Sequence, residues 1–283
     1  MLLRIRTDAE MTLRRLLRDR LAPILVLLVP VVFLAAAVAI TPEREVWVVL
    51  ASFPTPDPPP LAPLPISPHG ALVSASERAI AAVFVGLASV AVVVAFLALA
   101  LLQRGAAATR RLVLEGYRPW EVLVARLAAL ACVDAAVTLV VGALLPLFLS
   151  ASRPAVLLAG LALGGLVFAG FGLLVAALFR SELVGILCVV LLANVDPGWL
   201  QNPAAFADAP WKAGIRLLPA HLPMQVALAG AFTDLPAWTQ AAGSLGYAAL
   251  LVGAAALVFT ARARPRLPRA RGRRGATVQA PPG

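Results

Sequence analysis

The chain has 283 residues, of which 61% are hydrophobic and only 13% are charged. A water-soluble domain carries about 25% charged residues, so this composition excludes an ordinary soluble protein. The net charge of +10 would suit a nucleic-acid-binding protein, but the 24 basic residues lie beside the ends of apolar blocks, so we expect no nucleic acid partner.

Residues 1–20 predict an amphipathic helix in the headgroup plane of the membrane. Its apolar residues share one helical face: Leu2, Ile5, Ala9, Leu13, Leu16 and Leu17. The arginines on the remaining surface favour an anionic inner leaflet, so membrane lipids are expected partners. The alternative is a solvated leader whose arginines only set the topology.

Long apolar blocks follow this helix. A bilayer core is about 30 Å thick and a helix rises about 1.5 Å per residue, so about 20 apolar residues cross it. Lipid leaves backbone polar groups unsatisfied, which requires helices. The sequence therefore predicts an all-α, polytopic integral membrane protein with a transmembrane domain at 21–261, whose six transmembrane helices cover about residues 21–40, 79–102, 122–149, 155–179, 181–200 and 241–261. A cleaved signal peptide is an alternative for the first block, but the block is longer than the usual h-region of about 7–15 residues.

The fifth block is the shortest of the six. Its apolar stretch, Leu183 to Val195, covers about 20 Å before Asp196-Pro197-Gly198. We therefore expect this span either to extend at a shielded end or to break within the membrane.

The basic residues orient the chain. Most of them precede Leu21, lie between spans two and three, or lie in the tail, and Arg180 lies between spans four and five. Only five lie in the outer segments: Arg44, Arg78, Arg153, Lys212 and Arg216. The positive-inside rule therefore places both termini in the cytoplasm of a cell (inner) membrane. The basic tail at 262–283 is predicted to be disordered.

Two large outer segments result from this topology. Residues 41–78 contain nine prolines and predict an extended, polyproline-like external linker. Residues 201–240 contain two candidate short helices, at Leu217-Leu218-Pro219 and at Val226 to Phe232. These either dip back towards the membrane or lie on the surface. Three tryptophans near this segment fit the headgroup level: Trp199, Trp211 and Trp238.

No catalytic constellation is present in the sequence. A phosphate-binding loop needs Gly-Lys before Ser or Thr, but the single lysine, Lys212, follows Trp211. His69 and His221 lie in different outer segments, and Cys132 and Cys188 lie inside apolar blocks. We therefore expect no enzyme activity, no metal site, no disulfide and no cofactor bound by this chain.

One acid and two glycines stand out within the spans. Asp134 lies about 18 Å into the third block, where a charge costs about 2.5–3.5 kcal/mol, so it must face protein or water. It either lines a translocation pathway or, as we favour, makes an interhelical polar contact helped by Thr138. Gly160 and Gly164 have the small-xxx-small spacing that permits close helix packing.

The connection between spans two and three mixes charged and aromatic residues. Residues 106–115 predict a short helix that ends at Gly116, and Pro119 suits the first turn of the next helix. The resulting elbow presents Arg110, Arg111, Glu115, Tyr117 and Arg118.

The chain resembles the membrane subunits of ABC-2-type exporters. The resemblance covers this elbow, the amphipathic N-terminus, the six spans and the short helices before the last span. The stretch from Arg110 to Arg126 is similar to the coupling element of that family. The resemblance implies that Arg110 to Glu121 contact a separate ABC ATPase subunit, which binds ATP and Mg²⁺. It also implies a second permease subunit, identical or different. A non-ATP secondary carrier or a membrane anchor subunit of another complex is the alternative.

Overall fold

The computed structural model describes residues 2–50, 71–105, 117, 119–179, 181–202 and 211–263. Six helices in these ranges are long and apolar enough to cross a membrane, the third and fifth including the short helical turn that follows them. They are α2 (Leu21–Ile40), α3 (Glu77–Arg104), α5 (Pro119–Leu144), α6 (Pro154–Leu178), α7 (Glu182–Val195) and α11 (Trp238–Ala263). The predicted all-α, polytopic membrane fold is therefore confirmed.

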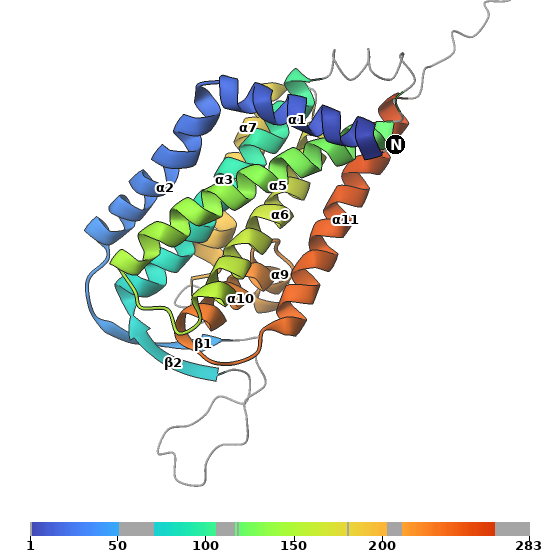
Figure 1. The fold of residues 1–283 in the computed structure, drawn as a ribbon. Helices are drawn as coiled ribbons and strands as arrows, with labels where there is room; N and C mark the ends of the chain where they lie inside the picture. Colours follow the sequence, from blue (N-terminus) through green and yellow to red (C-terminus); the bar gives the residue numbers. More distant parts are fainter. Residues whose placement is uncertain are drawn as a thin grey trace, which may run out of the picture.

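Helices α3 and α6 form the centre of the bundle (Figure 1). They pack closely because α6 carries Gly172 at the contact, where an added Cβ would overlap the backbone of Ala95 in α3. Large side chains of both helices, such as Leu87 of α3 and Phe168 of α6, are fully buried. Helices α2 and α5 flank α3, and α11 packs on α6. The two central helices therefore provide the frame on which the other spans lie.

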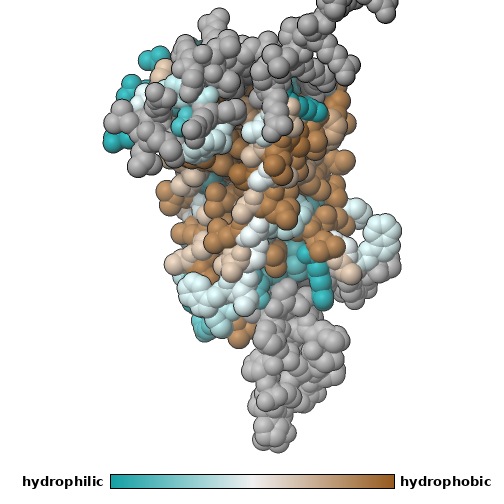
Figure 2. Space-filling model, turned by 90° about the vertical axis from the view of Figure 1, so that its right-hand side faces the viewer, coloured by the Kyte–Doolittle hydropathy of each residue, from teal (hydrophilic) through white to brown (hydrophobic). Residues whose placement is uncertain are grey.

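The outer helices expose apolar side chains to their surroundings. Leu183 of α7 is 78% exposed and Leu257 of α11 is 73% exposed. Figure 2 shows a hydrophobic band across the middle of one face, with hydrophilic residues gathered at both ends. A water-soluble protein would bury such a band, whereas hydrocarbon accepts it.

The N-terminal amphipathic helix is present as α1 (Leu2–Arg18) and lies across one end of the bundle, against α5 (Figure 1). Leu16 is buried, while Arg14, Arg15 and Arg18 are exposed. We call this end of the molecule the α1 end.

The opposite end carries a β-hairpin, which corrects the prediction of a polyproline-like linker throughout 41–78. Strands β1 (Glu45–Leu50) and β2 (Ala71–Ser76) pair antiparallel, with Glu45 opposite Ser76. The prolines of this segment fall before residue 45 and between residues 51 and 70, so both strands are proline-free, and β1 is rich in valine. Residues 51–70 lie outside the described part. We call this end the hairpin end.

The fifth span extends beyond its apolar stretch and does not break. A π-helical turn, Asp196–Leu200, continues α7 to give 19 helical residues from Glu182 to Leu200. At about 1.5 Å per residue these cover about 28 Å, close to the full hydrocarbon thickness. Asp196 and Pro197 are buried, so the polar end of this span is shielded by protein.

The second outer segment contains two short helices, α9 (Lys212–Arg216) and α10 (His221–Phe232). The prediction of a helix at Leu217-Leu218-Pro219 is wrong, because these residues form the turn between α9 and α10. Helix α10 is buried along nearly its whole length, which excludes a surface helix at this position. Glycines allow it to touch α6, because a Cβ added at Gly160 or Gly230 would overlap the backbone of Ala227 or Leu157. Residues 203–210 and the tail from 264 lie outside the described part.

Candidate functional site

The predicted elbow connects α3 to α5 at the α1 end. Tyr117 is half-buried, Pro119 begins α5, Trp120 is exposed and Glu121 is buried. The other predicted elbow residues lie outside the described part: Arg110, Arg111, Leu112, Leu114, Glu115, Gly116 and Arg118. The two ends of the connection are nevertheless fixed, at Gly105 where α3 stops and at Pro119 where α5 starts.

Arg126 of α5 holds the end of α3. Its side chain is only 5% exposed, and Nη2 donates a hydrogen bond to the carbonyl oxygen of Gly105 at 3.4 Å. A cation beside the last carbonyls of a helix is favourable because the helix dipole is negative there. An added Cβ at Gly105 would lie 2.5 Å from the backbone carbonyl oxygen of Leu101 and 2.7 Å from Arg126 Nη2, so glycine suits this position.

Asp8 of α1 supplies a negative charge to the same place. Burial raises the pKa of the Asp8 carboxyl, and the positive charge of Arg126 opposes that rise. Helix α1 packs against α5, so the attraction links the N-terminal helix to the helix that follows the elbow. The prediction from the sequence gives Arg126 no role of its own. A charge within the first turns of an apolar span is the signal in the sequence that points to it.

Four further side chains join the ends of α3, α6, α7 and α11 at the α1 end. Arg104 at the end of α3 donates to Glu182 Oε1 at the start of α7, at 3.1 Å from Nε and 2.9 Å from Nη2. Gln103 Nε2 donates to the Phe179 carbonyl oxygen at 3.2 Å. Arg262 Nη2, near the end of α11, donates to the Leu178 carbonyl oxygen at 2.9 Å. We call this set the polar collar: Gln103, Arg104, Arg126, Glu182 and Arg262.

Asp134 lies in the contact between α5 and α6. It is 3% exposed, and Thr138 Oγ1 donates to its Oδ1 at 3.5 Å. A Cβ added at Gly165 would overlap the carboxyl group, so Asp134 rests on the surface of α6. The position suits an interhelical contact.

Of the two predicted packing glycines, Gly160 faces α10, and Gly164 faces Leu87 of α3.

A second buried polar network lies at the hairpin end, and we call it the Asp196 network. The Asp196 carboxylate accepts hydrogen bonds from Gln201 Nε2 at 2.8 Å and from the Ala220 backbone N–H at 2.7 Å. The Gln201 Oε1 is 2.9 Å from His221 Nδ1, which donates to it. Burial, assisted by the positive charge of Arg216, lowers the pKa of His221 to about 4.

Sequence reasoning missed the Asp196 network. In the sequence, Asp196 indicates only the end of the fifth block, and His221 is a candidate only for metal binding. The sequence gives no signal that pairs them, because the contact depends on where α10 folds back.

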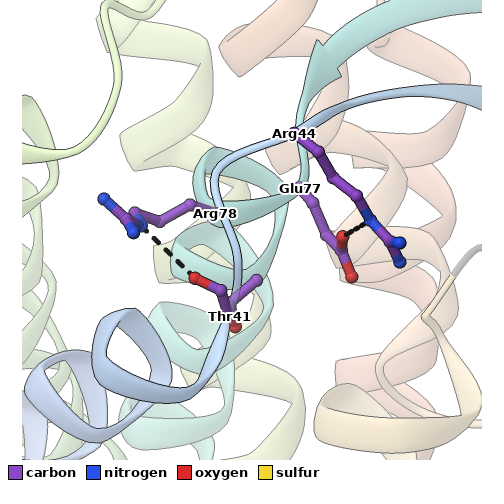
Figure 3. A network of polar contacts seen from close by, with 4 residues as sticks. All are labelled: Thr41, Arg44, Glu77 and Arg78. Carbon is purple, nitrogen blue, oxygen red and sulfur yellow. Dashed lines mark hydrogen bonds and ion pairs between the residues drawn. The ribbon is translucent and has the colours of Figure 1, made fainter.

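The base of the β-hairpin is held by charges (Figure 3). Arg44 pairs with Glu77, the first residue of α3, and Glu77 raises the pKa of Arg44. Arg78 Nη1 pairs with Glu43 at 3.1 Å, and its Nε donates to the Thr41 carbonyl oxygen at 3.4 Å. The hairpin is thus attached to α3 beside both of its strands.

Within the described ranges, no three His, Cys, Asp or Glu side chains come together as a metal site. Sequence comparison gives no matching family model and no similar curated protein. The functional assignment therefore rests on the geometry of the helix bundle and its two polar ends.

Proposed function

We propose that the chain is the membrane-spanning permease subunit of an ATP-driven ABC-2-type exporter. It couples ATP hydrolysis by a separate ATPase subunit to export of a substrate across the cell (inner) membrane. ATP and Mg²⁺ belong to the ATPase, and this chain has no catalytic role of its own. A second permease subunit, identical or different, completes the pathway.

The observation that carries this proposal is the polar collar around the ends of the elbow. The elbow leaves α3 at Gly105 and returns at Pro119, and the first of these ends is bonded to Arg126 of α5. The other collar contacts join α3 to α7, α3 to the end of α6, and α11 to the end of α6. A force on the elbow therefore reaches five of the six spans through direct contacts.

The distribution of charge supports a cytoplasmic α1 end. Exposed arginines gather there, at Arg14, Arg15 and Arg18 of α1 and at Arg104 and Arg262 of the collar. Under the positive-inside rule such an end faces the cytoplasm, where an ATPase has access to it. The same arginines suit contact with anionic lipid headgroups.

The coupling follows from these contacts. Closure of the ATPase dimer moves the elbow, the collar passes that movement to the helix ends, and the packing of the bundle changes. Packed helices shift between discrete arrangements because close-packed interiors deform poorly. Two bundles facing each other then admit and release substrate between them.

Co-purification tests the proposal. The tagged chain is purified from its native membranes in mild detergent, and a Walker-type ATPase is expected with it. Glu115→Arg, which reverses a charge in the predicted elbow, should lose most of this ATPase. Glu43→Arg reverses an exposed charge at the hairpin end and is the matched control, expected to retain it. Full ATPase recovery with Glu115→Arg, or none with the unaltered chain, contradicts the proposal.

A further inference from the structure

Helix α7 has little side-chain packing along its length. Leu187 and Leu191 are 65% and 61% exposed. Its buried residues, Gly185, Val189 and Ala193, form one narrow face with a spacing of four residues. That face lies against α3, where an added Cβ at Gly185 would come within 2.7 Å of Leu99 Cδ1. Side-chain packing therefore holds α7 chiefly through this one face.

Polar contacts hold α7 at both of its ends instead. At the α1 end, Glu182 in its first turn is paired with Arg104 of the polar collar. At the hairpin end, its π-helical turn begins with Asp196, which is fully buried and is bonded to Gln201 and to the backbone of Ala220. Hydrogen bonds to a buried carboxylate are among the stronger ones in a protein, and losing one leaves a buried charge unsatisfied.

The helix that follows the Asp196 network is anchored differently at its two ends. The start of α10 is tied to α7, through Ala220 and through Gln201 to His221. The end of α10 is tied to the turn before α6: the Arg153 N–H donates to the Gly230 carbonyl at 2.8 Å, and the Ser152 N–H donates to the Ala231 carbonyl at 3.1 Å. Helix α10 also packs on α6 at Gly160, so a shift of α7 relative to α6 must either move the start of α10 on the surface of α6 or break one of these attachments.

We infer that α7 is a mechanical link between the two ends of the membrane domain, and that Asp196, Gln201 and His221 are positioning residues that make the start of α10 follow α7. A displacement at the polar collar then changes the seating of α10 at the far side of the bundle. This role rests on the proposed function for the origin of the displacement. The attachment of α10 to α7 does not depend on an ATPase.

Thiol labelling of α10 tests the link in the purified chain in nanodiscs. Cys132 and Cys188 are first replaced by alanine, and Met224→Cys, at a fully buried position of α10, is the probe. Asp196→Asn keeps the shape of the side chain but removes its charge and one acceptor. It should speed labelling by about tenfold, the change that a loss of about 1.4 kcal/mol gives. Asn194→Ala is the control, because Asn194 Nδ2 donates to the Val190 carbonyl oxygen within its own helix. It should label like the parent.

A second comparison tests transmission along α7. Glu182→Gln weakens the contact with Arg104 and should change the labelling rate of the α10 probe about twofold or more. In the Asp196→Asn background the same substitution should have no effect, because α10 no longer follows α7. Gln201→Met repeats this comparison without altering a charged group, in case Asp196→Asn does not fold.

Three results would overturn the inference. One is an unchanged labelling rate in Asp196→Asn. Another is an equal effect of Glu182→Gln with and without the network. The third is equal acceleration at Leu173→Cys, a fully buried position of α6, which would indicate general loosening of the bundle. Because no ATPase is present, each of these results leaves the co-purification test of the proposed function unaffected.

Discussion

Acidification should destabilise the protein through His221. Its ordinary pKa is about 6.5, and in the folded protein it is lowered to about 4. The folded state therefore resists protonation, whereas the unfolded state binds a proton below pH 6.5. The contribution of this histidine to stability is complete above pH 6.5 and is lost as the pH falls towards 4.

The size of the effect follows from the two pKa values. Between pH 7.5 and pH 4.5 the difference in proton binding amounts to about 2.5 kcal/mol in the free energy of unfolding. The side chain is 3% exposed, so solvent screens little of this difference. A variant that lacks His221 also loses the contact with Gln201, and this loss changes the free energy of unfolding by an amount that does not depend on pH.

The assay is unfolding by SDS titration in mixed micelles at both pH values, with the unaltered chain and His221→Gln compared side by side. Carboxylates elsewhere titrate equally in both proteins, so they cancel in the comparison. We expect the unaltered chain to lose about 2.5 kcal/mol more than His221→Gln on acidification. An equal loss in the two proteins would refute the placement of a neutral, buried His221 in the Asp196 network.

Three further predictions concern the helix contacts. Gly160→Val should lower the free energy of unfolding by about 1–3 kcal/mol in the same SDS assay, because the added Cβ overlaps the backbone of α10. Gly253→Val is the control and should change the free energy of unfolding by less than about 0.5 kcal/mol, because an added Cβ there meets open space. Equal effects would contradict the α6–α10 contact. Arg104→Gln should cost less than about 1 kcal/mol, since this ion pair is half-exposed, yet should reduce ATP-driven transport by the reconstituted complex. Normal transport would remove this pair from the coupling path. Arg126→Met should lower the free energy of unfolding by about 1–3 kcal/mol, because it leaves the half-buried Asp8 carboxylate without its cation, and should speed proteolysis of α1. Unaltered proteolysis would show that Arg126 does not hold that helix.

The spans could be predicted from the sequence because the bilayer imposes a length on every crossing helix. The blocks at 21–40 and 155–179 correspond closely to α2 and α6. The fifth span shows where composition misleads. Asp196 and Pro197 end the apolar stretch, yet both are buried inside the bundle and the helix continues through them. Hydropathy measures the side chain and not the polar partners that the fold brings to it.

The hairpin and the buried networks depend on contacts between distant residues. Nine prolines dominate the composition of 41–78 and conceal the two short proline-free strands at its ends. Arg126 meets the Gly105 carbonyl, and Asp196 meets the start of α10, only after the helices have packed. No local pattern encodes either pair. The elbow, in contrast, is predicted from a local mixture of charged and aromatic residues and from its resemblance to a coupling element.

Cysteine accessibility at the elbow tests the central claim most directly. Tyr117→Cys and Glu43→Cys lie at opposite ends of the bundle. Each is introduced into a version of the chain that has no other reactive thiols, and the two variants are compared in intact cells. A membrane-impermeant maleimide should label Glu43→Cys at once and Tyr117→Cys only after the membrane is permeabilised. Labelling of Tyr117→Cys in intact cells would place the elbow outside, where no ATPase of the cytoplasm could act on it, and would contradict the account.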